Sequence, residues 1–247
     1  KHTLINYTLS QKKKVYYSYH MKKFFTFSLL LFFLTSNLNA HISHYKGLKK
    51  IEMEIFRNNK LIGYNYYFFT EDNEVTFVTN QIKFTVELLG AIIFEVEGYG
   101  EEKYKEDKLI SFKSKTFQNK KEKFVDLKFN EINNLFEIKG SSFNGEAEIT
   151  NIIGNWWNHK LLQANSQISP ISGSIKEQVV IFVGREVIEL YGKKYEVEHF
   201  KLKSKNIDLP EDKKLNFDIW YDKKNSMILK VSYSRMGNWE YRLKKFE

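Results

Sequence analysis

The sequence predicts an all-β protein, mainly antiparallel, with a strongly curved sheet or open half-barrel and one short helix. Two observations support this fold class. Apolar and polar residues alternate with a period of two through most of the chain, and polar turns separate the runs at roughly ten-residue spacing. Short connections of this kind are typical of up-and-down antiparallel pairing, and we expect about ten to fourteen strands.

The clearest strands lie in residues 215–246. Three alternating apolar runs are separated there by residues 222–225 and 236–238, which are polar or contain glycine. This pattern predicts a three-stranded antiparallel meander that closes the sheet. We interpret Asp222 as a turn residue of this meander rather than as an acid catalyst.

The earlier strands follow the same pattern. We predict strands over residues 51–55, 61–69, 75–89, 91–99, 109–117, 124–129, 135–138 and 146–149, and then over 179–183, 186–190 and 195–203. Gly63 is expected at a β-bulge and Gly90 at a bend, whereas Gly184 and Arg185 are expected to form a turn. Residues 101–103 and 105–107 are predicted to form the exposed end of a ribbon.

The alternation stops in residues 152–174, where residues 154–162 are the best candidate for a short helix. We expect this segment to cover an apolar cavity, with Trp156, Trp157, Asn158 and His159 as ligand-binding residues. The alternative is that the tryptophans only pack in the core, since each ring buries a large apolar area.

The N-terminal region has the parts of a secretory signal peptide. A basic start at Met21 precedes the apolar residues 24–34, and a small residue, Ala40, stands at the expected cleavage site. Eleven helical residues reach roughly 16 Å, about half the hydrocarbon thickness of a bilayer, so no permanent membrane span is predicted. We therefore divide the chain into a non-native leader (1–20), a signal peptide (21–40) and a single β-rich domain (41–247).

The charge of the predicted mature chain is close to balanced. The whole sequence has 39 Lys and Arg against 30 Asp and Glu, a net charge of +9. Residues 1–40 hold six of these lysines and no acidic residue, which leaves 33 against 30, or +3, in residues 41–247. Nucleic-acid binding thereby loses its main support, and no nucleic acid is predicted as a partner.

Catalytic and metal-binding patterns are sparse. The chain has no cysteine, no Gly-x-Ser-x-Gly motif and no His-x-x-x-His pair, so we predict no catalytic residue, metal or cofactor. The sequence favours a non-enzymatic protein without deciding the question. If the protein is a hydrolase or isomerase, His159 is the candidate centre, and a carboxylate or hydroxyl should lie within hydrogen-bond reach of its imidazole.

Four short motifs resemble a known family. These are Leu61-Ile62-Gly63, Trp156-Trp157-Asn158, Trp220-Tyr221-Asp222 and the run from Trp239 to Leu243. With the signal peptide and the strand series, they make the chain resemble an uncharacterised family of secreted bacterial proteins, domain of unknown function 6134, over most of residues 48–246. The layout is also similar to periplasmic half-barrel lipoprotein carriers, whose curved sheets are covered by helices, of which this chain has few. The resemblance implies no known reaction and no catalytic residues.

The sequence thus predicts an exported protein, periplasmic or secreted, of non-enzymatic binding or envelope-associated function, with an apolar cavity. The expected partner is a lipid or another apolar small molecule, and the oligomeric state is left open. Two alternatives remain: the enzyme centred on His159, and a small outer-membrane β-barrel. Exported chains with ten-residue alternating strands fit such a barrel, but Glu95 and Glu97 interrupt its lipid-facing band.

Overall fold

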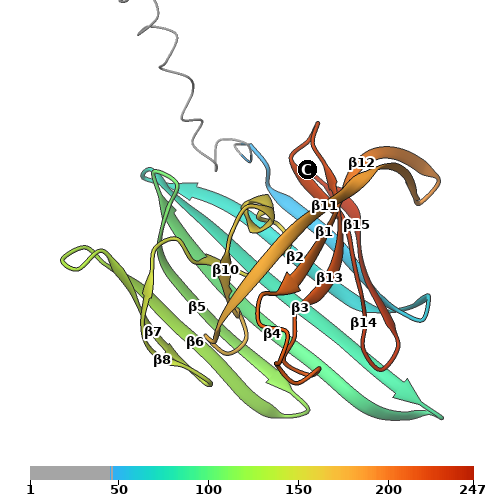
Figure 1. Ribbon diagram of the computed structural model, residues 1–247, viewed down its shortest axis with the longest axis horizontal. Coiled ribbons are helices and arrows are strands. Elements are labelled where there is room, and N and C mark those ends of the chain that lie inside the picture. Colours follow the sequence, from blue (N-terminus) through green and yellow to red (C-terminus); the bar gives the residue numbers. More distant parts are fainter. Residues whose placement is uncertain (1–44, 46) are drawn as a thin grey trace, which may run out of the picture. The chain divides into compact units, whose positions relative to one another are not determined.

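A computed structural model describes Tyr45 and residues 47–247 (Figure 1). The predicted leader, the signal peptide and the start of the predicted mature domain lie outside these described residues, so those assignments stay predictions. No helix in the described part of the chain is long and apolar enough to cross a membrane.

The described residues form one fifteen-stranded sheet. Its strands are β1 (Lys50–Arg57), β2 (Lys60–Asp72), β3 (Val75–Leu88), β4 (Ala91–Lys105), β5 (Lys108–Gln118), β6 (Lys121–Asn130), β7 (Leu135–Gly140), β8 (Asn144–Glu148), β9 (Ile152–Ile153), β10 (Ser166–Ile168), β11 (Ile175–Leu190), β12 (Lys193–Ser204), β13 (Asn216–Asp222), β14 (Met227–Ser234) and β15 (Asn238–Phe246). One short 3₁₀ helix, η2, spans His159–Leu162.

The first and last strands pair at the centre of the sheet. β1 lies between β2 and β15, and from this centre the strands follow one another outward to β8 on one side and to β9 on the other. Every neighbouring pair is antiparallel except β9 with β10. The sheet is therefore open, with β8 and β9 as its two edges.

Tight two-residue turns explain the regular pairing. Type I′ hairpin turns need positive φ at both central residues, which asparagine and glycine tolerate best. The described turns with two positive φ angles are Asn58-Asn59, Asn73-Glu74, Leu89-Gly90, Glu106-Asp107, Asn119-Lys120, Tyr191-Gly192 and Met236-Gly237. The all-β, antiparallel and strongly curved fold predicted from the alternation is confirmed.

Several local predictions are also confirmed. β13, β14 and β15 form the predicted meander. The register of β1 with β2 shifts opposite Gly63, as expected for a bulge, and Gly90 lies in the β3–β4 turn. Asp222 ends β13 and accepts hydrogen bonds from the Lys224 amide and the Asn225 side chain, as a turn residue does.

Three local predictions are wrong. Gly184 and Arg185 do not form a turn, because β11 is one continuous strand and the extra residue next to Gly184 is absorbed as a bulge against β12. The predicted ribbon end includes the β4–β5 turn at residues 105–107, but residues 101–103 are not part of it, because β3 and β5 extend far enough to pair with β4 there. The expected number of ten to fourteen strands is too low. The sheet has fifteen, because the irregular segment contributes two short strands, β9 and β10.

Residues 151–174, here called the insert, lie against the inner face of the sheet. Figure 1 shows the insert between the β3–β6 side of the sheet and β11. Hydrogen bonds tie it on several sides: Ser114 Oγ donates to the Pro170 carbonyl, and Gln178 Nε2 donates to the carbonyls of Leu161 and Ala164. Ile153 and Ile168 of the insert are fully buried against a core that includes Leu127 and Phe136, so the insert completes the hydrophobic core of β5–β8.

Two bulge glycines provide a matched stability test. A Cβ on Gly63 would lie 2.1 Å from the Lys83 carbonyl oxygen, whereas a Cβ on Gly184 would have no atom within 4 Å. We expect Gly63→Ala to destabilise the fold by about 1–3 kcal/mol through overpacking. Gly184→Ala is expected to be neutral or stabilising by up to about 1 kcal/mol, since alanine loses less backbone entropy than glycine on folding. Urea denaturation of both variants checks this, and equal effects would contradict the assigned packing.

Candidate functional site

The four residues predicted to bind a ligand separate into two pairs. Trp157 and Asn158 are 1 % and 2 % exposed, whereas Trp156 and His159 are half-buried. Of the helix predicted over residues 154–162, only residues 159–162 are helical, as η2, and Asn158 caps this helix by accepting a hydrogen bond from the Lys160 amide. Trp157 and Asn158 therefore hold the insert in the interior, and Trp156 and His159 retain exposed surface.

A buried carboxylate anchors the insert to the sheet. Glu102 of β4 is 2 % exposed, and its Oε1 accepts hydrogen bonds from Trp157 Nε1 at 2.9 Å and Asn155 Nδ2 at 2.5 Å. The Tyr104 hydroxyl donates a short hydrogen bond to the other oxygen, Oε2. Asn158 hydrogen-bonds the Tyr104 hydroxyl in turn. Three donors around one buried carboxyl satisfy the requirement that buried polar groups be hydrogen-bonded.

Burial dominates the electrostatics of this carboxyl. Removal from water raises the pKa of Glu102 above its ordinary value, although the three donors act in the opposite direction. Burial likewise raises the pKa of Tyr104 well above its usual range, and the neighbouring Glu102 adds to this effect. Glu102 and Tyr104 together form a structural polar anchor, since their side-chain oxygens bind residues of the insert and each other.

A second polar group supports the insert from β2. The Tyr67 hydroxyl accepts hydrogen bonds from the Trp156 amide at 3.2 Å and from Asn65 Nδ2 at 2.8 Å. Asn65 is oriented by Asn80 of β3, which donates to Asn65 Oδ1 at 2.6 Å. A hydrogen bond to β2 thus holds the backbone at Trp156, while the rings of Trp156 and Trp157 pack against different neighbours.

The surroundings of His159 contain a hydroxyl group. The Tyr45 hydroxyl lies 2.8 Å from His159 Nδ1, and it also donates to the Trp157 carbonyl oxygen at 2.8 Å. The Tyr221 ring lies 5.5 Å from the imidazole, centroid to centroid. Burial raises the pKa of Tyr45, so this hydroxyl stays protonated at neutral pH. A hydroxyl therefore lies within hydrogen-bond reach of the His159 imidazole, as expected for an enzyme centred on this residue. The tyrosine is suited to orienting the imidazole ring.

A continuous row of aromatic rings extends from Trp156 along the inner face. Successive ring centroids lie 5.1 to 5.9 Å apart in the order Trp156, Phe217, Tyr233, Trp239, Phe84 and Phe94. Trp239 and Phe84 are buried, and the other four rings are half-buried. This aromatic row leads from the insert, across β13–β15, to the β3–β4 hairpin.

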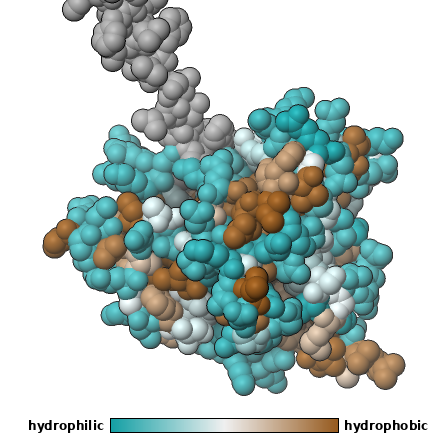
Figure 2. Space-filling view, in the orientation of Figure 1, coloured by the Kyte–Doolittle hydropathy of each residue, from teal (hydrophilic) through white to brown (hydrophobic). Residues whose placement is uncertain are grey.

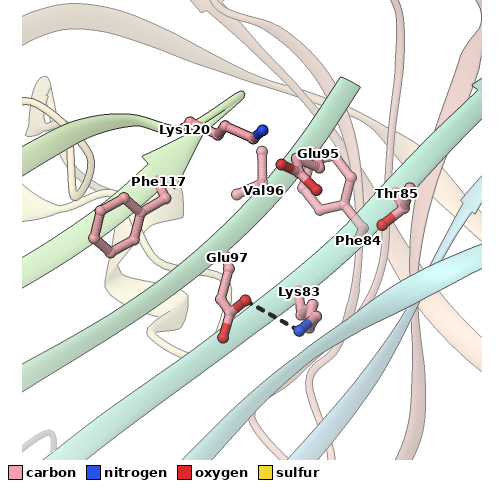
Figure 3. Close-up of a pocket in the computed structure, with 8 residues that line it drawn as sticks. All are labelled: Lys83, Phe84, Thr85, Glu95, Val96, Glu97, Phe117 and Lys120. Carbon is pink, nitrogen blue, oxygen red and sulfur yellow. Dashed lines mark hydrogen bonds and ion pairs between the residues drawn. The ribbon is translucent and has the colours of Figure 1, made fainter. Parts of the chain in front are cut away.

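A cavity beside strands β3, β4 and β5 has a different character (Figure 3). It measures about 330 Å³ and is lined by Lys83, Phe84, Thr85, Glu95, Val96, Glu97, Phe117 and Lys120. Lys83 and Glu97 form an ion pair at 3.0 Å, and this hydrogen bond raises the pKa of Lys83. Half of the lining side chains are charged, so an apolar ligand is better matched by the aromatic row than by this cavity.

His199 lies on a face of strand β12. Its ring stacks on Trp220 at 4.6 Å, and its nitrogens face Glu186 at 3.2 Å and Asp218 at 3.0 Å. Among the described residues, no group of three or more His, Cys, Asp or Glu side chains is arranged to hold a metal ion.

Sequence reasoning missed Tyr45, Glu102, Tyr104 and Asn155. A signal for two of them exists in β4, where Glu102 and Tyr104 share the parity of buried Val96 and so face inward. Our interpretation of residues 101–103 as an exposed ribbon end overlooked this alternation. Tyr45 precedes the first strand, and its pairing with residues 112 and 114 positions away leaves no local pattern.

These features define a barrel-like but open antiparallel β protein, whose inner face is partly filled by an insert and carries a row of aromatic rings. The chain belongs to the family described as domain of unknown function DUF6134, which matches residues 53–244. This confirms the family expected from the sequence motifs.

A solved structure supports the same fold. The chain is similar to a crystal structure of a β-barrel-like protein of domain of unknown function DUF1849 from Brucella abortus, with a TM-score of 0.54 and 11 % identity. The similarity covers 81 % of this chain and 96 % of that chain. No curated protein matches the sequence.

The buried carboxyl has a testable effect on stability. Because the pKa of Glu102 is raised above 4.5 in the folded protein, the folded state keeps a proton that the unfolded chain releases at lower pH. Its contribution to the free energy of unfolding is therefore full below about pH 4.5 and is lost as pH rises through the raised pKa. Glu102→Gln removes this titration while keeping an acceptor for Trp157.

We expect the stability of the wild-type protein relative to Glu102→Gln to fall as pH increases across that window. Urea denaturation of both proteins over a pH series measures the difference, which cancels titrations that they share. Glu97→Gln, an exposed change on the same strand, is the control. A difference that is constant with pH, or that rises, would refute the assignment.

Proposed function

We propose that the protein is exported to the periplasm or secreted, and that it is a non-enzymatic, envelope-associated protein that binds a lipid or another apolar molecule. The observation that carries the proposal is the aromatic row on the inner face. Export is supported by the sequence of residues 21–40, which has the basic, apolar and small-residue parts of a signal peptide.

The aromatic row suits an elongated apolar ligand. Trp156, Phe217, Tyr233 and Phe94 are half-buried in an otherwise close-packed inner face, so their remaining exposed ring surface is available for contact. Each square ångström of apolar surface removed from water contributes roughly 25 cal/mol. Tyr233 adds a polar group, and burial together with Tyr241 raises the pKa of its hydroxyl, so a neutral phenol faces the ligand.

Ligand binding can be tested with native and added lipids. Lipid extraction of the purified protein followed by mass spectrometry should recover a bound apolar molecule. Titration with a fluorescent fatty acid should change tryptophan emission, because Trp156 and Trp239 belong to the row. Phe217→Ala should weaken binding about tenfold, since the contact area of one ring is lost.

Phe117→Ala is the matched control, because Phe117 is 40 % exposed and lines the charged cavity instead. It should bind the fatty acid as the wild-type protein does. Equal affinity of the wild-type protein, Phe217→Ala and Phe117→Ala for the fatty acid would refute the proposal. So would the recovery of no bound molecule by extraction together with no binding of the added fatty acid.

An enzyme centred on His159 is the second candidate, and the Tyr45 hydroxyl 2.8 Å from Nδ1 favours it. Under our proposal, a panel of p-nitrophenyl esters should show no turnover above the buffer rate. Turnover that His159→Gln abolishes and His199→Gln preserves would instead establish the enzyme. The outer-membrane barrel is disfavoured by the open edges β8 and β9, because lipid cannot satisfy the hydrogen bonds of a free edge.

A further inference from the structure

The β3–β4 hairpin extends beyond the strands on both sides of it. β2 pairs with β3 only as far as Phe84, and β5 pairs with β4 only from Val96 onward. β3 and β4 continue to pair with each other as far as Leu88 and Ala91. Residues 86–94 therefore form a two-stranded ribbon that projects from the sheet, at the lower right of Figure 1.

The end of this ribbon is apolar and exposed. Leu88, Leu89, Ile92 and Ile93 are 58 %, 99 %, 60 % and 46 % exposed. Figure 2 shows apolar surface projecting at the lower right, where Figure 1 has the β3–β4 turn. Exposing four large aliphatic side chains at one tip is costly in water, and such patches mark interaction sites.

We propose that this hairpin tip, residues 88–93, inserts into the interfacial layer of a lipid bilayer. Successive side chains of a strand point to opposite faces, so Ile92 and Ile93 project from the two sides of the ribbon. A flat protein surface, including that of a second copy of the chain, would cover only one side of such a ribbon. A fluid lipid layer surrounds the tip and covers both sides at once, which singles out the bilayer as the occupant.

The charges at the base of the ribbon indicate how the tip is held. Lys83 pairs with Glu97 at 3.0 Å, and Lys60 lies 3.8 Å from Glu87. Because these charges are paired, anionic headgroups gain no net attraction, and apolar burial is the driving force. Glu87 directly precedes the tip and its side chain is half exposed, so insertion stops at the depth where its carboxylate remains in water.

This inference is independent of the proposed ligand, since it concerns the projecting tip and not the inner face. The two surfaces nevertheless meet at the base of the ribbon, where Phe94, the last ring of the aromatic row, lies 5.9 Å from Phe84.

The absence of cysteine makes a site-specific test simple, because Leu89→Cys provides the single thiol in the chain. An NBD fluorophore on that thiol should shift to the blue and brighten severalfold when phosphatidylcholine vesicles are added. Lipids that carry a spin label near the headgroup should quench it. Ile132→Cys, 98 % exposed in the β6–β7 turn, is the control and should not respond. Residues 24–34 are the same in both proteins, so their affinity for lipid does not produce a difference.

Adding Ile92→Asp to the labelled protein should weaken its partition into vesicles about tenfold or more, since an apolar contact is replaced by a charge. Its circular dichroism should be unchanged, since the tip lies outside the core. The response should be the same with phosphatidylglycerol present and at high salt. Three results would overturn the proposal: no response at position 89, a response that requires anionic lipid, or a blue shift without vesicles that grows with protein concentration and so reveals a second copy.

Discussion

The pairing of β1 with β15 is the constraint on which the rest of the sheet depends. It joins the two ends of the described chain at the centre, and each half of the sheet then grows outward from it. Met53 and Ile55 of β1 have no exposed surface, and the carbonyl of Glu247 accepts hydrogen bonds from Lys49 and Lys50. Because every other neighbouring pair of this sheet is made by strands consecutive in the chain, this one long-range pairing fixes how the two halves meet.

The insert fills the space that this curvature creates. Its tryptophan pair contacts both halves of the sheet: Trp157 packs on Phe69 of β2 and Tyr104 of β4, whereas Trp156 packs on Phe217 of β13. An apolar side chain alone has no directional preference, but the hydrogen bond from Trp157 Nε1 to Glu102 fixes the orientation of the indole. The buried carboxyl thus gives the insert a unique position, at the cost of removing a charge from water.

Two of the apolar surfaces that remain after folding are connected. The half-buried rings of the aromatic row lie on the inner face, and the aliphatic tip of the β3–β4 hairpin lies at its end. Under the two proposals made above, the tip would face lipid beside an aromatic ligand surface, an arrangement suited to exchanging an apolar molecule with a membrane.

The sequence by itself determined the fold class, the closing meander and the family, because alternation of period two and short polar turns are local properties. It also singled out the Trp156–His159 segment through the break in that alternation. Tertiary structure alone decided that Trp157 and Asn158 face inward, that Tyr45 meets His159, and that Glu102 is buried beneath the insert. These contacts join residues more than fifty positions apart, and no local pattern encodes them. The projecting tip is likewise a matter of register, since Leu88 to Ile93 become exposed only because β2 and β5 end their pairing earlier.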